Sequence, residues 1–156
     1  MNGLVREVAI LQHNLQYLRK IAGWSAEDLG ALIGVTKQTI SNLENLKTPL
    51  SVTQYIAIRA VLDKRIESDA GRGPILRKIL DIIMNCDVSK LPKNKREKFE
   101  SSLENISKAA ASGISDDILM NLVQLLFSEF IESDSSSAGL FTLLNWLNLN
   151  NNKKGS

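Results

Sequence analysis

One stretch decides how the first half of this chain folds, and it reads LRKIAGWSAEDLGALIGVTKQTISNLEN at residues 18–45. Its apolar side chains recur at three- and four-residue steps on both sides of Gly34, as they do on two short helices. Gly30 lets two helices approach closely, and Gly34 suits a turn with a positive φ. Ile40 has the spacing that packs the second helix back on the first. The stretch therefore predicts a helix, a tight turn and a second helix.

Capping patterns mark where the neighbouring helices begin. Ser25 is followed three residues later by Asp28, and Ser51 by Gln54, and both pairs are capping-box patterns. Thr36 is the predicted N-cap of the helix between them. Together with an earlier amphipathic segment, these signals predict a four-helix N-terminal domain. Its helices, with their N-caps, are predicted at about residues 8–22, 25–33, 36–45 and 51–67.

The rest of the chain is predicted to be helical too. Residues 69–74 contain two Gly and one Pro, so we assign them to a linker between two domains. Beyond them, helical apolar spacing without period-two alternation predicts a module of about four helices at residues 75–149. The polar tail, residues 150–156, is predicted to be loose. The predicted fold class is all-α, with a helix-turn-helix domain at residues 1–68.

Composition narrows the class of function. The chain carries 19 basic and 17 acidic side chains, a net charge of +2, which is too small for a polyanion-binding tail. One Cys and one His cannot form an internal disulfide or a protein-only zinc site, which favours a reducing, cytoplasmic location. The sequence shows no nucleophile beside a base, no phosphate-binding Gly loop and no membrane span. We therefore expect no catalysis, no cofactor and no metal.

The exposed positions of the third predicted helix carry amide, hydroxyl and cationic groups. Such groups pair with base edges in the major groove of DNA, which admits one helix. Taken alone, they fit an ordinary solvated helix face better. Residues 18–45 resemble, however, the phage-repressor and Cro-type (Xre-like) family of bacterial DNA-binding domains, over about residues 11–66 in all. The resemblance implies a recognition helix at residues 36–45 whose base-reading residues are Lys37, Gln38, Ser41 and Asn42.

The DNA backbone is expected to be contacted from two places. The resemblance implies that the residues near phosphates include Thr36, Thr39, Asn45 and Lys47. The backbone amides of Ser25 and Ala26 begin a helix, and such amides bind anions with the help of the helix dipole.

Two further features concern how the recognition helix is held. In the family, the positions of Arg19 and Glu44 form a partly buried ion pair, and we expect the same structural pair here. After Asn45 the family usually has a left-handed Gly, whereas this chain has Leu46. Either Leu46 adopts that conformation with mild strain, or the helix ends in another way. The placement of Asn45 and Lys47 on phosphates depends on the answer.

These observations predict a sequence-specific DNA-binding transcriptional regulator, acting as a dimeric repressor on an inverted-repeat operator in double-stranded DNA. One recognition helix contacts too few base pairs to be selective, and the C-terminal helices carry more apolar side chains than a small core can cover. The predicted homodimer interface comprises Leu122, Leu126, Phe130, Leu140, Phe141, Leu144, Trp146 and Leu147. The alternative is an antitoxin-like or adaptor protein whose C-terminal helices bind another protein or a small effector. Packing of these helices within one subunit also stays open.

Overall fold

The described part of the chain is helical, which confirms the all-α fold class. The structure, a computed structural model, describes the backbone of residues 2–133 and the side chains of residues 4–128. Within these residues it contains α-helices, one 3₁₀ helix and no strand. The elements are α1 Asn2–Ala22, α2 Ala26–Ile33, α3 Lys37–Glu44, α4 Val52–Ser68, α5 Arg72–Asn85, η1 Val88–Lys90, α6 Lys93–Ala111 and α7 Asp116–Ser133. The last predicted helix and the polar tail lie outside the described residues.

Helices α2 and α4 begin where the capping patterns predict, and side-chain hydrogen bonds cap both of them. Ser25 Oγ accepts the N–H of Asp28 at 3.0 Å, and Asp28 Oδ2 accepts the N–H of Ser25 at 2.8 Å. Ser51 and Gln54 exchange the same two bonds at 3.0 Å each. These side chains satisfy amides that the first turn of a helix leaves without intrahelical partners.

The corner between α2 and α3 uses glycine at both predicted positions. Gly34 ends α2 in the left-handed conformation, with a φ of 78°. Gly30 is buried where α2 meets the start of α3, and a Cβ atom there would lie 2.6 Å from the carbonyl O of Val35. A larger residue at position 30 would therefore push the two helices apart.

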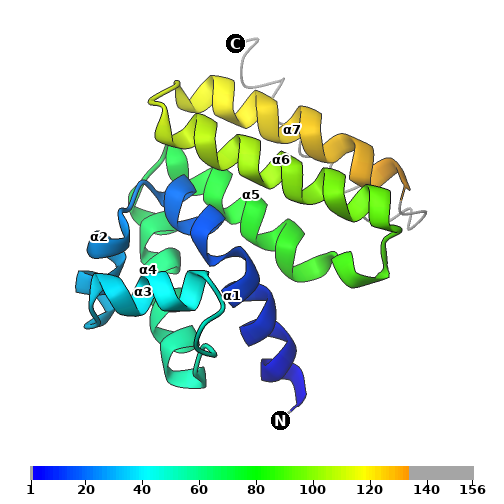
Figure 1. Ribbon diagram of the computed structural model, residues 1–156. Helices are drawn as coiled ribbons and strands as arrows, with labels where there is room; N and C mark the ends of the chain where they lie inside the picture. Colours follow the sequence, from blue (N-terminus) through cyan, green and yellow to red (C-terminus); the bar gives the residue numbers. More distant parts are fainter. Residues whose placement is uncertain (1, 134–156) are drawn as a thin grey trace.

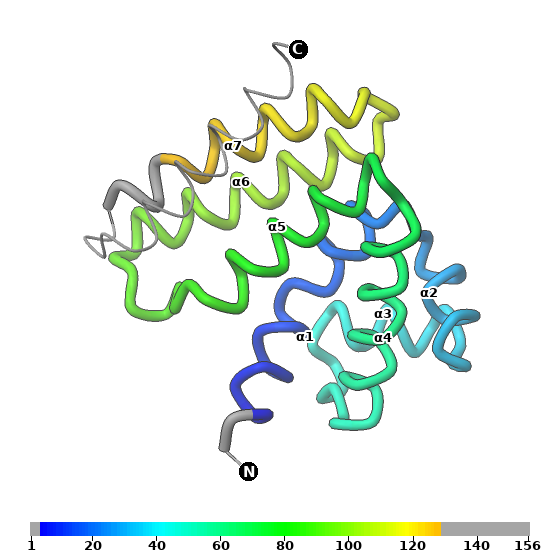
Figure 2. The backbone as a smooth tube through the Cα atoms, turned by 180° about the vertical axis from the view of Figure 1, so that it is seen from behind, coloured from blue at the N-terminus to red at the C-terminus, as the bar shows by residue number. Residues whose placement is uncertain are grey.

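Helix α1 belongs to both halves of the molecule. It packs on one side against α3 and α4 and on the other against α5 and α6. Helix α7 packs across α5 and α6, so that α1, α5, α7 and α6 form a four-helix arrangement (Figures 1 and 2). The buried apolar side chains form one core that extends from Leu11 to Phe127. The C-terminal half therefore completes its packing with a helix of the N-terminal half.

The connection between α4 and α5 is shorter than the predicted linker. Helix α5 begins at Arg72, so residues 69–71 alone connect the two helices. Gly73 lies against the end of α4, where a Cβ atom would come within 2.2 Å of the carbonyl O of Ile66. Residues 72–74 form the first turn of α5, where the missing N–H of Pro74 is not needed.

Two arginines bind the carboxyl end of α1, one from α4 and one from α5. Arg65 Nε, on α4, donates to the carbonyl O of Ala22 at 3.0 Å. Arg72 Nη1, on α5, donates to the carbonyl O of Ile21 at 2.9 Å. Arg72 Nε also pairs with Asp116 Oδ1, at the start of α7, at 2.9 Å. Cations at the carboxyl end of a helix complement its dipole, so this point joins α1 to α4, α5 and α7.

Candidate nucleic-acid interface

Helix α3 turns its polar side chains to the solvent. On the inner side of the same helix, Ile40 is fully buried. The four residues predicted to read bases lie on the outer side, where Lys37 and Gln38 are exposed and Ser41 and Asn42 are half-buried. The structure therefore brings these four residues together on one face of one short helix.

Two of these side chains are oriented by each other. Gln38 Nε2 donates a hydrogen bond to Asn42 Oδ1 at 3.0 Å. This bond leaves Gln38 Oε1 as an acceptor and Asn42 Nδ2 as a donor. Side-chain amides pair with adenine edges, and the Lys37 ammonium next to them suits a guanine edge. The face can thus form hydrogen bonds of both polarities.

A buried ion pair holds α3 against α1. Arg19 Nε donates to Glu44 Oε2 at 2.7 Å, and Arg19 Nη2 donates to Glu44 Oε1 at 2.9 Å. Arg19 Nη1 donates to the carbonyl O of Trp24 at 2.9 Å. The side chains of Arg19 and Glu44 are only 10% and 7% exposed. One guanidinium therefore fixes the last turn of α3 and the turn before α2 at the same time.

The end of α3 shows which conformation Leu46 adopts. Leu46 has a φ of 59°, and among the described residues no other non-glycine has a positive φ. Its N–H donates to the carbonyl O of Leu43 at 3.2 Å, and the N–H of Lys47 donates to the carbonyl O of Asn42 at 2.9 Å. These two bonds are those of a Schellman cap, which normally has Gly at this position. Leu46 thus takes the left-handed conformation, and α3 ends at the same place as it would with Gly.

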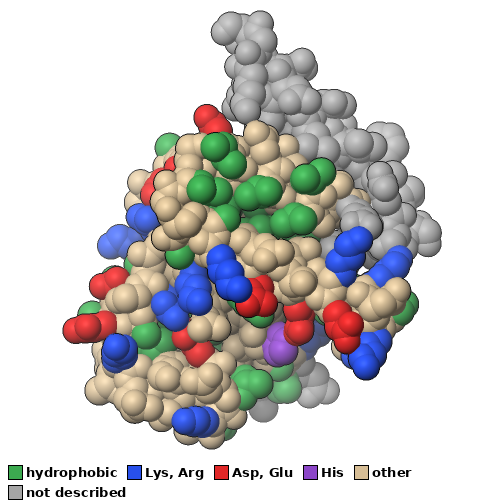
Figure 3. Space-filling model, turned by 45° about the horizontal axis from the view of Figure 1, so that its top comes forward, with side chains coloured by type: hydrophobic (Ala, Val, Ile, Leu, Met, Phe, Trp, Pro, Cys, Tyr) green, Lys and Arg blue, Asp and Glu red, His purple; other side chains and the backbone are tan. Residues whose placement is uncertain are grey.

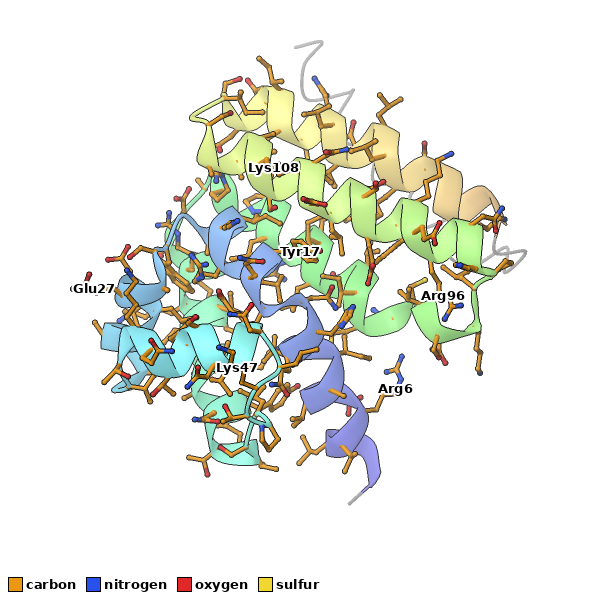
Figure 4. All side chains as sticks on the ribbon, in the orientation of Figure 1. Arg6, Tyr17, Glu27, Lys47, Arg96 and Lys108 are labelled. Carbon is orange, nitrogen blue, oxygen red and sulfur yellow. The ribbon has the colours of Figure 1, made fainter. Side chains whose placement is uncertain are left out.

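The residues predicted near phosphates border the outer face of α3. Thr36 caps the helix by accepting the N–H of Thr39 at 3.1 Å, and their hydroxyl groups lie 3.0 Å apart. At the other end, Asn45 Nδ2 donates to the carbonyl O of Ser41 at 2.9 Å. Lys47 is exposed just beyond the end of α3 (Figure 4). Hydroxyl, amide and ammonium groups therefore lie at both ends of this helix.

The comparison with known families covers the same segment. Residues 15–68 match a family model described as Helix-turn-helix. Over this segment the chain is similar to Xre/Cro-like helix-turn-helix domains. The match confirms the resemblance predicted over about residues 11–66, and it indicates a DNA-binding regulator of transcription. No curated protein and no solved structure matches the chain.

Within the helix-turn-helix domain, the start of α2 differs from the expected anion site. The N–H of Ser25 is already bound by the Asp28 carboxylate. Hydrogen bonds from the backbone and side chain of Ser25 hold the pKa of Asp28 below its ordinary value, so this carboxylate stays charged. Glu27 adds a second acid in the same turn. A phosphate at Ser25 would have to displace Asp28, so Ala26 is the better candidate of the two predicted amides.

Helix α7 covers the far side of the molecule from the helix-turn-helix domain, and its apolar residues divide into two groups. Leu119, Val123 and Phe127 are buried. The rings of Phe127 and Phe99 pack edge-on, with their centroids 5.4 Å apart. Ile118 and Leu125 are 55% and 69% exposed. Figure 3 shows hydrophobic side chains gathered on this outer part of the molecule. No helix of residues 2–133 is long and apolar enough to cross a membrane.

The predicted dimer interface is only partly described. Leu122 is half-buried, and Leu126 is half-buried and packs against the core. The other predicted members, Phe130, Leu140, Phe141, Leu144, Trp146 and Leu147, lie outside the described side chains. Ile118 and Leu125 are not among the predicted members, although they are more exposed than Leu122 and lie four and three residues from it, on the same helical face.

A cleft that no sequence pattern predicts lies between α1, η1 and α6. It has a volume of about 690 Å³ and apolar walls that include Ile10 and Phe99. Arg6 and Arg96 lie at its rim, on the other side of α1 from α3 (Figure 4). Its lining comes from segments about 80 residues apart in the sequence, so no local pattern could have revealed it.

Proposed function

We propose that this chain is a sequence-specific repressor of transcription that inserts α3 into the major groove of double-stranded DNA. The observation that carries the proposal is the outer face of α3, formed by Lys37, Gln38, Ser41 and Asn42. It lies on a helix that a buried ion pair holds rigidly against α1. A rigid helix keeps its base-reading side chains in one register. Occupation of an operator blocks other proteins from the same DNA, so repression follows from binding alone.

Phosphate contacts would place the protein on the duplex without reading its sequence. We assign them to Thr36, Thr39, Asn45, Lys47 and the amide of Ala26, and to the amide of Ser25 only where a phosphate displaces the Asp28 carboxylate. The cap at Leu46 supports this assignment because it leaves Asn45 and Lys47 at the end of α3. A regulator of this kind works where the DNA is, and we propose a cytoplasmic location.

The two halves of the chain are proposed to have different roles. Residues 1–68 bind DNA, and residues 75–149 hold two copies together. The support is the outer face of α7, where Ile118, Leu122 and Leu125 share one side of a helix and leave apolar surface in water. A two-fold dimer then presents two α3 helices to an inverted-repeat operator, about 34 Å apart.

Selection from random duplexes tests the proposal. The full-length protein is incubated with a library of random double-stranded DNA, and bound molecules are amplified and sequenced. The expected result is an enriched inverted repeat whose half-sites are separated by about one helical turn. No enrichment over several rounds at low salt would refute sequence-specific binding. The full chain is required because a fragment of residues 1–70 would uncover the side of α1 that packs on α5 and α6.

The exposed face of α7 also favours a second candidate function. It could hold a different protein, so that the chain acts as an adaptor or antitoxin-like protein tethered to DNA. The cleft between α1 and α6 fits in size a small effector that would touch both halves. Light scattering separates the two uses of the α7 face, because a face that binds a second copy makes the free protein a dimer, whereas a face that binds only a different protein does not.

A further inference from the structure

Gln12 of α1 holds the loop that joins α3 to α4. Its Nε2 donates to the carbonyl O of Thr48 at 2.7 Å and to that of Leu43 at 3.1 Å. Its Oε1 accepts the N–H of Leu50 at 3.0 Å. One side chain thereby ties together the end of α3 and the chain leading to α4, although these positions lie 31 to 38 residues away in sequence.

The loop has few other anchors. Residues 45–49 are all exposed, and the buried side chain that follows them is Leu50, at 5% exposure. Leu46 lies in a left-handed conformation that its side chain disfavours. The cap of α3 secures the first part of the loop. Gln12 is the partner in the hydrogen bonds that the structure shows for the Thr48 carbonyl and the Leu50 amide. The loop conformation therefore depends on Gln12 as well as on the cap.

We propose that Gln12 is a positioning residue for DNA binding, which fixes the loop so that Asn45 and Lys47 reach phosphates beside the end of α3. It also keeps this loop in place when a leucine, not a glycine, occupies position 46. The inference rests on the proposed function. Gln12 acts through the loop, because its polar atoms bind protein backbone. Phosphates are alike in every duplex, so loss of Gln12 weakens binding to all sequences by the same factor.

The test compares Gln12→Leu with a matched control. Gln12→Leu keeps most of the side-chain volume and removes all three hydrogen bonds. Gln16→Leu makes the same change at an exposed position one turn further along α1. Fluorescence anisotropy measures binding of the full-length proteins to two duplexes of equal length, the selected operator and a mixed sequence, over a series of salt concentrations. Circular dichroism checks that helix content is unchanged.

The expected result is specific to Gln12. Gln12→Leu weakens binding to both duplexes by about three- to tenfold, as for the loss of one or two hydrogen bonds. The slope of log affinity against log salt concentration falls by about 0.9 for each phosphate that the protein no longer neutralises. Gln16→Leu changes neither quantity. Gln12→Glu, of nearly equal size, places a carboxylate oxygen against two carbonyls and is expected to show the same weakening, so it replaces Gln12→Leu if that variant loses helix content.

A double-mutant cycle shows whether the effect passes through the loop. In the background Asn45→Ala/Lys47→Ala, Gln12→Leu is expected to change affinity by less than about twofold, because its targets are gone. A full effect in that background would overturn the proposed route. Unchanged affinity and salt slope in the Gln12 variants, with normal binding by the wild type, would refute the role of Gln12 alone. Failure of the wild type to bind either duplex would refute the proposed function itself.

Discussion

Arg19 and Glu44 form a two-bonded ion pair that is nearly closed to solvent, and it joins α1 to the last turn of α3. The pair lies directly behind the outer face of α3, so its geometry sets the angle at which that face is presented. It is therefore the contact through which folding and DNA binding are most closely connected.

Removing one partner of this pair is expected to destabilise the fold strongly. Arg19→Met leaves the Glu44 carboxylate buried without its cation, and the free energy of unfolding should fall by about 3–5 kcal/mol. Urea denaturation followed by circular dichroism measures it. The control is Lys108→Met, which breaks an exposed pair with Glu104, 67% and 54% exposed, and should change stability by less than about 1 kcal/mol. Equal effects of the two variants would contradict a structural role for Arg19.

The outer face of α3 is expected to carry the sequence specificity. Lys37→Ala, Gln38→Ala and Asn42→Ala should each weaken binding to the selected operator by about 1–3 kcal/mol and leave the fold intact. The double variant Gln38→Ala/Asn42→Ala should lose less than the sum, because the two amides orient each other. Lys108→Ala, at the far end of the molecule, serves as the control (Figure 4). Unchanged affinity in all three single variants would exclude α3 as the recognition helix.

Leu46→Gly is expected to stabilise the protein slightly. Glycine takes a φ of 59° without strain, and Leu46 is 59% exposed, so its side chain contributes little packing. The net gain should be up to about 1 kcal/mol, because glycine also makes the unfolded chain more flexible. Thermal melts measure it against Leu32→Gly, an exposed leucine inside α2, which should lose about 1 kcal/mol. A similar loss at Leu46 would mean that its side chain packs.

Acid should weaken the start of α5 through Asp69. Its carboxylate accepts the N–H groups of Arg72 at 2.8 Å and Gly71 at 3.0 Å, and the bond from Arg72 chiefly lowers its pKa below the ordinary 3.8. A group with a lowered folded-state pKa stabilises the fold above its unfolded value and loses that effect as pH falls through the folded pKa. The difference in urea midpoint between wild type and Asp69→Ala should therefore be constant from about pH 7 to about pH 5 and shrink below about pH 4. A difference that does not shrink in acid would show that Asp69 acts without its charge.

The outer face of α7 is expected to join two copies of the chain. Ile118→Lys/Leu125→Lys puts two cations on that face and should convert a dimer to a monomer in light scattering at micromolar concentration. Ile56→Lys, which makes the same kind of change at an exposed apolar position on α4, should leave the dimer intact. If the wild type is a monomer both free and on DNA, the dimer proposal fails. If the double-lysine variant still dimerises, the interface lies elsewhere.

The sequence by itself determined the features that depend on neighbours within one helical turn. The capping boxes at Ser25 and Ser51 and the turn at Gly34 were all predictable, because each joins groups three or four residues apart or needs one backbone angle. The predicted polar face of α3 followed for the same reason, since helical spacing decides which residues share a side. The Arg19–Glu44 pair, 25 residues apart, was expected only through the family resemblance.

Only the tertiary structure decided how these elements are shared and held. Three features depend on contacts between distant segments, for which residue spacing carries no signal. They are the packing of α1 against both halves, the cleft beside α6 and the hydrogen bonds of Gln12 to the loop near Leu50. Leu46 shows the boundary between the two kinds of information. The sequence left two ways for α3 to end. The cap hydrogen bonds to the carbonyls of Asn42 and Leu43, together with the bond from Gln12 to Leu43, stabilise the left-handed conformation of Leu46. A strained backbone angle persists because the packed surroundings compensate its free energy, and those surroundings exist only after the helices have come together.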